Sequence, residues 1–473
     1  MKTIKKSLKG MQRFDFLRKQ YPVFNYQKYK WSIRGQKLNI RFCFDCGDIQ
    51  FSPTSSIKFP KSIDPEKWAK PRKKIIDNLV FNIGMIEMVS YWKATCSPSI
   101  HVACGTLSKA QINWWKKLYY HGLGEFLYLN DIKIKQESLV RIECVKGKNL
   151  QTNERLKPKD NRLLVPIGGG KDSLASITML SQTRDKKFYL LMNPTKAAKD
   201  SAKSAPERYG EAAVLVKRVI DPTLIALNKK GFLNGHTPFS AMLAFYATLV
   251  SVFVNTKYSC LSNEASANEP TIIGTDINHQ YSKTVEFEKD FNNYLKKYIS
   301  PHYVYMSLLR PLNEFQIVRI FSQREKNLSI FKSCNVGSKK DIWCCDCSKC
   351  LFVCILLSAH IGIEKTNKVF GESLLNKKSL KKAFLELVGH ADTKPFECIG
   401  TIDEIRVAIT LIKQQEPTLF AKQFLLRHFA TKFPGSLAND AKIEEIKNTF
   451  FKGHRLNQKF KKLVYEGYRT ASS

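Results

Sequence analysis

The chain has 473 residues, 43% of them hydrophobic and 25% charged, which excludes a disordered chain and is too long for one ordinary domain. Lys and Arg number 77 against 41 Asp and Glu, a formal charge of +36 that favours polyanionic partners without selecting nucleic acid, an acidic surface or a nucleotide. Because the basic residues are spread along the chain, a lysine-rich proteome explains the charge equally well.

Apolar runs and cysteines indicate the compartment. The basic segment 1–13 is followed by no apolar stretch, so no secretory signal is predicted. The longest uncharged apolar run, 238–254, is shorter than the ~20 residues of a spanning helix. The cysteines are odd in number, 13, and cluster between Cys334 and Cys350, which indicates reduced thiols or a metal site. We therefore expect a cytoplasmic protein that does not bind to a membrane.

The first part of the chain, 1–158, is predicted to be an α+β domain. Hydrophobic and polar residues alternate over 38–45, the pattern of half-buried antiparallel strands. Apolar residues then recur at helical spacing over 75–93, which predicts an amphipathic helix, and an aromatic helix is predicted over 109–120. A polar, basic linker over 146–161 ends this domain.

A glycine-rich turn follows the next predicted strand, which ends at Ile167. The turn is Gly168-Gly169-Gly170, and Lys171-Asp172-Ser173 opens an apolar-periodic helix. Glycines let a ligand approach the main chain, and a helix start offers free N–H groups, so the turn suits a phosphate. A ligand-free glycine turn is the alternative. The spacing fits neither a dinucleotide fingerprint nor a Walker A loop.

The same turn resembles the pyrophosphatase loop of ATP-pyrophosphatases, Ser-Gly-Gly-x-Asp-Ser, except that Gly168 replaces the first serine. Strands predicted over 188–192 and 213–220 alternate with helices, which indicates an open parallel α/β sheet over 159–360. The resemblance implies a sheet of the ATP-pyrophosphatase type and adenine contacts near Asn193. His236 precedes the start of a long apolar helix and is a candidate phosphate ligand or a plain loop residue.

Polar side chains are concentrated between residues 260 and 288, without periodicity, between two predicted helices. Such a loop on a rigid scaffold is typical of a binding or catalytic segment, although a solvated loop is also polar. Its acids, bases and amides are candidates for proton transfer and substrate binding: Asn263, Glu264, Asn278, His279, Tyr281, Lys283 and Glu286.

Four cysteines follow the spacing C-x9-C-x2-C-x2-C: Cys334, Cys344, Cys347 and Cys350. Thiolates at this spacing can converge on one tetrahedral ion, which predicts a closed, structural Zn²⁺ site. The spacing also resembles the zinc knuckle of 7-cyano-7-deazaguanine synthase, another ATP-pyrophosphatase. A redox-active cluster, for example one that transfers sulfur to tRNA, is the alternative.

The last part, 361–473, is predicted to be a mainly helical cap, with helices near 380–388, 402–412, 417–430 and 443–451. One loop, 389–400, interrupts this pattern. Cys398 in that loop is a candidate catalytic residue if the cap reaches the active site.

Several of these segments together resemble the UDP-N-acetylmuramoyl-L-alanyl-L-glutamate epimerase family over most of the chain. They are the helix from Asn82 to Lys93, the glycine loop, the Ser262-Asn-Glu segment, Asn278-His-Gln-Tyr-Ser-Lys with Glu-Phe-Glu after it, the cysteine knuckle and Lys394-Pro-Phe-Glu-Cys. The resemblance implies an isomerase of peptidoglycan synthesis that uses ATP and Mg²⁺ to convert the terminal L-Glu of the UDP-muramoyl dipeptide to D-Glu. A muramoyl ligase that needs no D-glutamate would supply this substrate.

The resemblance also implies roles for the loop residues. Gly168 to Ser173 would hold the triphosphate, Asp172 would position Mg²⁺, and Lys171 would add a cation. The base and acid would come from Glu264, His279, Tyr281, Lys283 and Cys398. Two other functions stay open: an ATP-pyrophosphatase that modifies tRNA or a deazapurine precursor, and a nucleotide-binding module without turnover. Nucleic acid is a disfavoured partner that the sequence leaves open.

Overall fold

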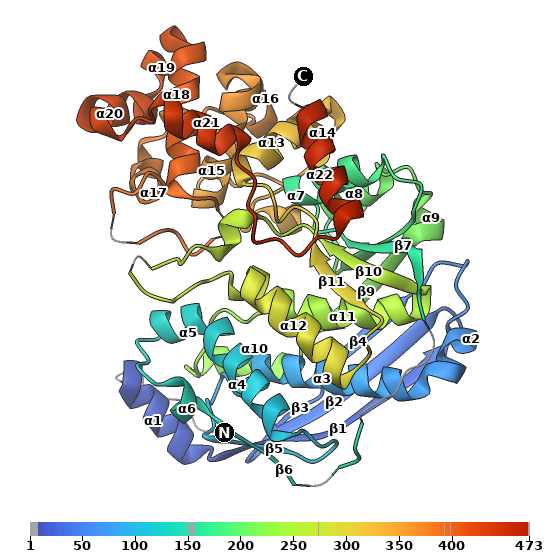
Figure 1. Ribbon diagram of the computed structural model, residues 1–473. Coiled ribbons are helices and arrows are strands. Elements are labelled where there is room, and N and C mark those ends of the chain that lie inside the picture. The colour runs from blue at the N-terminus through green and yellow to red at the C-terminus, as the bar shows by residue number, and fades with distance from the viewer. Residues whose placement is uncertain are drawn as a thin grey trace.

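The computed structural model describes residues 8–145, 147–150, 157–272, 274–391, 393–397 and 399–471 (Figure 1). The strands of this part form one eleven-stranded sheet in the order β11-β10-β7-β8-β9-β4-β2-β1-β5-β6, with β3 paired to β2. In chain order their bounds are β1 Val23–Arg34, β2 Lys37–Cys46, β3 Ile49–Phe51, β4 Thr54–Lys58, β5 Ser99–Val102, β6 Arg141–Cys144, β7 Lys159–Pro166, β8 Lys186–Met192, β9 Ala213–Val219, β10 Thr256–Leu261 and β11 Val304–Ser307.

The sheet has a parallel half that contains the glycine turn. Strands β11, β10, β7, β8 and β9 run parallel, whereas β4, β2 and β1 continue the sheet in antiparallel fashion. Numbered along the chain, the parallel strands lie in the order 5-4-1-2-3, which is a doubly wound arrangement. The order of strands along the sheet reverses between β7 and β10, and sheets of this kind bind their ligands at that point. The strand order and directions confirm the predicted open, largely parallel sheet.

Alternate residues of the parallel strands enter two separate cores. Leu164 of β7 faces the core that contains α3 and α11, whereas Leu163 and Val165 face the core that contains α7, α13 and α15. Both faces of the parallel half are therefore buried, as its apolar strands require. The helices before β10 are α1 Gly10–Gln20, α2 Pro65–Ala69, α3 Lys73–Trp92, α4 Lys109–Gly122, α5 Gly124–Leu129, α6 Gln136–Leu139, α7 Lys171–Leu180, α8 Lys196–Lys203, α9 Tyr209–Ala212, α10 Pro222–Lys229 and α11 Phe239–Val254.

The burial of helix α3 differs from the prediction made from the sequence. The segment 75–93 was expected to be amphipathic, but α3 is buried on nearly every side, including its polar residues Asn78, Asn82 and Glu87. The two asparagines bond to one another and to backbone, and Glu87 forms a two-point ion pair with Arg218 of β9, at 2.7 and 2.8 Å. These bonds replace the solvent that a polar helix face would normally contact.

The chain ends in a helical region, as predicted, which gathers at one end of the molecule in Figure 1. Helix α22 was not foreseen from the sequence and returns to pack on α7. Past β10 the helices are α12 Val285–Tyr298, α13 Glu314–Ser322, α14 Glu325–Ile330, α15 Ser348–Ile361, α16 Ile363–Phe370, α17 Lys381–Leu387, α18 Ile402–Gln415, α19 Pro417–Lys422, α20 Phe424–Lys432, α21 Asp440–Asn448 and α22 Gln458–Thr470. Within the described residues, every helix is too short or too polar to cross a membrane.

Candidate active site

The glycine turn joins β7 to α7 at the reversal point of the sheet. Gly169 has a φ of +88°, and a Cβ atom there would lie 2.4 Å from the backbone nitrogen of Ala198, so only glycine fits. The N–H of Gly168 donates to the Ser173 hydroxyl at 3.0 Å, which closes the turn on itself. Gly168 itself is exposed, so its backbone is accessible from outside. A tight, accessible turn at a helix start is the geometry that a phosphate group needs.

Lys171 points into the protein instead of lining the turn. Its side chain is fully buried, and its ammonium group forms ion pairs with Asp172 and with Glu314 of α13. Burial alone would lower the pKa of Lys171, but the two carboxylates raise it, so the ammonium stays charged. The ammonium of Lys171 contacts Asp172 and can orient this carboxylate; its expected role as a cation at the phosphates stays a prediction.

Two acids contact this lysine, and they differ in charge. Burial would raise the pKa of Asp172, but Lys171 and Lys349 lower it, so this carboxylate stays ionised. Burial raises the pKa of Glu314 to about 7, with the neighbouring Asp172 carboxylate as a further cause, although Lys171 opposes both. Asp172 is also 32% exposed, whereas Glu314 is 1% exposed. Asp172 is therefore the acid that can reach a ligand or a cation.

Glu404 extends the acidic cluster from the helical region. It is fully buried at the start of α18 and accepts hydrogen bonds from the Ser266 hydroxyl, at 2.8 Å, and the Glu314 N–H, at 2.7 Å. Burial raises its pKa to about 7, with Glu314 as a further cause. Sequence reasoning missed both glutamates. Each stands in the first turn of a helix, where an acid is expected for capping alone.

Arg310 holds the polar segment after β10 against the sheet. Its buried guanidinium donates to the backbone carbonyls of Glu264, at 2.6 Å, and of Lys283. Asn263 adds a hydrogen bond to Ser307 at 3.1 Å, and Glu264 is 2% exposed. The segment predicted to carry catalysis is therefore fixed at both ends beside the glycine turn, although Arg310 was not foreseen.

Two histidines and one glutamate meet on the other side of this segment. The Nδ1 atom of His279 contacts an Oε atom of Glu125, and Nδ1 of His236 lies 3.5 Å from the same oxygen. Burial lowers the pKa of His236 to about 4, with His279 as the next cause, so its imidazole is neutral at pH 7. The sequence singled out both histidines but not Glu125, which lies about 110 residues or more away from them along the chain.

Lys283 connects the glycine turn and the histidine cluster electrostatically. Its charge lowers the pKa of Asp172 and also that of His236. Asp172 and His236 therefore both feel the charge of the Lys283 ammonium, although they belong to elements far apart in sequence. A substrate with several negative groups could contact the turn and the histidines together.

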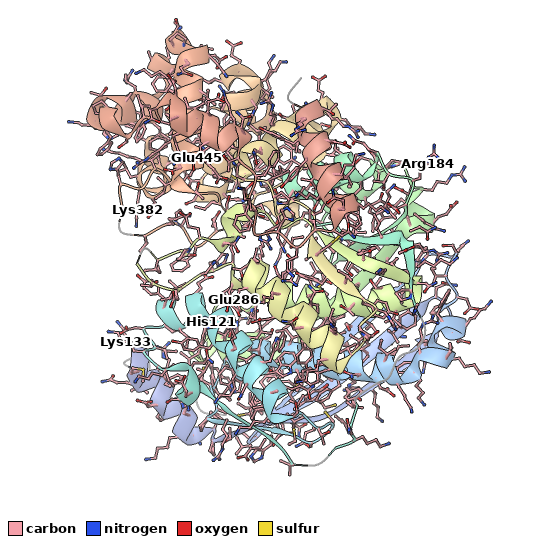
Figure 2. All side chains as sticks on the ribbon, viewed as in Figure 1. His121, Lys133, Arg184, Glu286, Lys382 and Glu445 are labelled. Atoms are coloured by element: carbon pink, nitrogen blue, oxygen red, sulfur yellow. The ribbon has the colours of Figure 1, made fainter. Side chains whose placement is uncertain are left out.

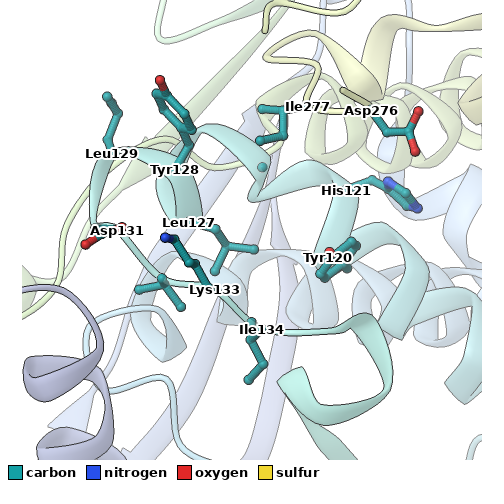
Figure 3. Close-up of a pocket in the computed structure, with 12 residues that line it drawn as sticks. Tyr120, His121, Leu127, Tyr128, Leu129, Asp131, Lys133, Ile134, Asp276 and Ile277 are labelled. Atoms are coloured by element: carbon teal, nitrogen blue, oxygen red, sulfur yellow. The ribbon is translucent and has the colours of Figure 1, made fainter. Parts of the chain in front are cut away.

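A cleft of about 780 Å³ opens beside the histidine cluster (Figure 3). Tyr128 and Leu129 stand at one end of it, and His121 with Asp276 at the other. Gly124 and Ile277, which also line it, are close neighbours in sequence of Glu125 and His279. Its volume falls within the range of small-molecule sites.

The four predicted metal-ligating cysteines do converge. The sulfur atoms of Cys334, Cys344, Cys347 and Cys350 all lie within 4.8 Å of one another, an arrangement that could hold a metal ion. Hydrogen bonding from Cys350 lowers the pKa of Cys347, which favours the thiolate form of this ligand. The segment before Cys334 also touches the glycine turn: the Lys332 N–H donates to the Gly169 carbonyl at 3.0 Å.

The other predicted site residues bond mainly to their neighbours in the fold. Asn193 has a φ of +45° and bonds through its side chain to the backbone of Arg218. Asn278 braces its own loop, Tyr281 is buried against His121, and Glu286 pairs with Lys117 at 2.6 Å beside His121 (Figure 2). Cys398 lies outside the described residues. The roles given to these residues stay predictions.

The fold defines the class: an α/β protein whose parallel half-sheet is doubly wound and carries a glycine turn at its reversal point. The MurL N-terminal domain matches residues 15–308 of this chain, and the MurL C-terminal domain matches residues 329–444. The chain therefore belongs to the MurL family. No solved structure matches it.

Three relatives of one name match most of the chain. UDP-N-acetyl-alpha-D-muramoyl-L-alanyl-L-glutamate epimerase from Micromonospora sp. is 32% identical over 378 residues, which is 78% of this chain and 81% of the relative. The enzyme of the same name from Salinispora tropica is 31% identical over 78% of this chain and 79% of the relative. That from Xanthomonas oryzae pv. oryzae is 31% identical, over 77% and 80%.

Proposed function

We propose that this protein is the epimerase that converts the terminal L-Glu of UDP-N-acetylmuramoyl-L-Ala-L-Glu to D-Glu, for peptidoglycan synthesis in the cytoplasm. Family membership and three relatives of that name support the activity and the substrate. A muramoyl ligase that attaches L-Glu would have to act upstream. The reaction makes and breaks a bond to hydrogen at the glutamate α-carbon, so it needs a base, an acid and a way to make that proton acidic.

We infer that ATP provides this acidity. The α-proton beside an ionised carboxylate is barely acidic, because its removal would place a second negative charge next to the first. Conversion of the carboxylate to an acyl adenylate, with release of pyrophosphate, removes the first charge. Water then cleaves the adenylate and leaves AMP. The observation that carries this proposal is the accessible glycine turn with ionised Asp172 at the reversal point of the sheet.

The turn fits the triphosphate and Mg²⁺ in its residue types and charges. Gly168 to Ser173 would hold the phosphates through backbone N–H groups, and Asp172 would bind Mg²⁺, which neutralises charge on the departing pyrophosphate when bound. Lys171 is then a positioning residue that keeps Asp172 ionised and oriented. The strand order of the parallel half supports the finer assignment to the ATP-pyrophosphatase type of sheet.

Proton transfer is assigned to the polar segment between β10 and α12, which supplies Glu264, Tyr281 and Lys283. The charge of Lys283 in this segment also acts on Asp172 of the turn, whose pKa it lowers. The cleft in Figure 3 would receive a remote part of the substrate, since it adjoins this segment. The four-cysteine cluster would hold a structural Zn²⁺, because four thiolate ligands would leave no position open to substrate.

An assay of pyrophosphate release separates this function from modification of tRNA. ATP and Mg²⁺ are supplied with either the UDP-muramoyl dipeptide or bulk tRNA, at low and moderate salt. We expect release with the dipeptide alone, at a rate that changes little with salt. Release that requires tRNA and falls steeply with salt would contradict the proposal. ATP binding without release on either substrate would favour a module without turnover.

A further inference from the structure

Glu125, His236 and His279 come from three separate elements and place one ligand atom each in a small volume. Glu125 stands in the first turn of α5, His236 precedes α11, and His279 lies in the segment before α12. Their Oε and Nδ1 atoms all lie within 4.8 Å of one another. The side chains are only 13%, 25% and 13% exposed, so little water competes for these atoms.

The backbone around each histidine is fixed, which makes the convergence a built feature. The ammonium of Lys93 donates to the carbonyl of Gly235, directly before His236. The N–H of His279 donates to the Thr271 hydroxyl at 3.0 Å. Neighbouring donors and acceptors of this kind hold ligand side chains in place in metal sites.

The ligand types select the class of ion. Two imidazole nitrogens and one carboxylate oxygen suit Zn²⁺, Co²⁺ or Fe²⁺, whereas Mg²⁺ prefers oxygen ligands alone. Around a tetrahedral ion with bonds of ~2.0–2.1 Å, ligand atoms lie roughly 3.3 Å apart. The 3.5 Å between His236 Nδ1 and the Glu125 oxygen is close to that separation.

We propose that Glu125, His236 and His279 bind a transition-metal ion that is distinct from both the Mg²⁺ of ATP and the ion of the cysteine cluster. Three protein ligands leave a fourth position for an oxygen atom of water or substrate. A carboxylate or carbonyl oxygen of the glutamate is the class of ligand that such an ion takes. This last assignment rests on the proposed function; the binding of the ion does not.

Titration with Co²⁺ tests the site, because cobalt reports its ligands. Thiolate ligands give an intense charge-transfer absorption, whereas nitrogen and oxygen ligands give weak visible bands only. Purified protein is stripped of metal and titrated, and bound cobalt is counted after gel filtration. We expect one equivalent without thiolate absorption, in addition to any that the cysteines bind.

Matched variants identify the residues that bind this equivalent of cobalt. His279→Ala and Glu125→Gln should each abolish it and leave the thiolate absorption unchanged, and circular dichroism confirms that both variants fold. Cys347→Ser should weaken only the thiolate-bound equivalent. His101→Ala is the control: His101 lies 3.3 Å from Glu143 but belongs to no group of three possible ligands among the described residues.

A wild-type protein that binds cobalt only with thiolate absorption, or not at all, would overturn the proposal. So would an equivalent without such absorption that survives in both His279→Ala and Glu125→Gln. Since the result is a stoichiometry and a spectrum, it is independent of whether the protein epimerises the dipeptide. A protein that binds this equivalent of cobalt but does not epimerise the dipeptide would count against the proposed function alone.

Discussion

Gly169 is the residue of the turn where one added methyl group should matter most. In Gly169→Ala the new Cβ would meet the backbone of Ala198 at 2.4 Å, and the φ of +88° is itself strained for alanine. We expect a loss of at least about 1–2 kcal/mol of stability and strongly weakened ATP binding, measured by thermal unfolding and calorimetry. Gly210→Ala, whose Cβ would meet nothing within 4 Å, should change neither. Equal behaviour of the two variants would refute this account of the turn.

Glu404 should make stability depend on pH. Its pKa is about 7 in the folded protein against 4.5 as an ordinary side chain, so between these values the folded state keeps a proton that the unfolded chain has released. The free energy of unfolding should therefore fall as pH rises from 4.5 to 7, by up to about 3 kcal/mol from this group. Denaturant titrations of Glu404→Gln should show a flatter dependence. The exposed Glu466→Gln is the control, and an unchanged slope in Glu404→Gln would exclude Glu404 as the cause.

The cysteine cluster and the glycine turn are neighbouring elements, which predicts an effect of one on the other. The Gly169 carbonyl and the Lys171 N–H bond to Lys332 and Ser333, directly before Cys334. Cys347→Ser should loosen this support and weaken ATP binding by roughly tenfold, or about 1.4 kcal/mol, with faster amide exchange at residues 168–173. Cys345→Ser is the control, because Cys345 is buried next to the cluster without belonging to it. An unchanged rate of amide exchange at residues 168–173 in Cys347→Ser would show that the cysteine cluster does not support the glycine turn.

Local patterns were enough to predict the elements that carry the turn, and not enough to predict its surroundings. The glycines and the helix start at Lys171 are contiguous, and the apolar runs of β8 and β9 are typical of buried parallel strands. Glu314 and Glu404 look like ordinary helix-start acids. Only the packing of α13 on α7 brings Glu314 to Lys171, and only that of α18 on α13 brings Glu404 to Glu314. Glu125 belongs to no motif that would single it out in the sequence. Its role depends on a contact across the fold that no local pattern contains.

At the scale of the whole molecule, one sheet joins parts that the sequence divides into domains. Strand β4 pairs with β9 in antiparallel fashion, and the Glu87–Arg218 ion pair links α3 to the same strand. We expect one cooperative unfolding transition across 1–360 because the sheet is shared, observed by calorimetry and by fluorescence at the same midpoint. Two separate transitions would support the predicted boundary at residue 158 as a true domain boundary.

The central claim is that ATP makes the glutamate α-proton removable, and exchange with heavy water tests it most directly. The UDP-muramoyl dipeptide is incubated in D₂O with the enzyme, ATP and Mg²⁺, and the glutamate is analysed by mass spectrometry and chiral chromatography. We predict deuterium at the α-carbon and D-Glu only when ATP is present, none with Asp172→Asn, and wild-type levels with the exposed control Asp403→Asn. Deuterium incorporated without ATP, or undiminished incorporation by a folded Asp172→Asn, would contradict the account.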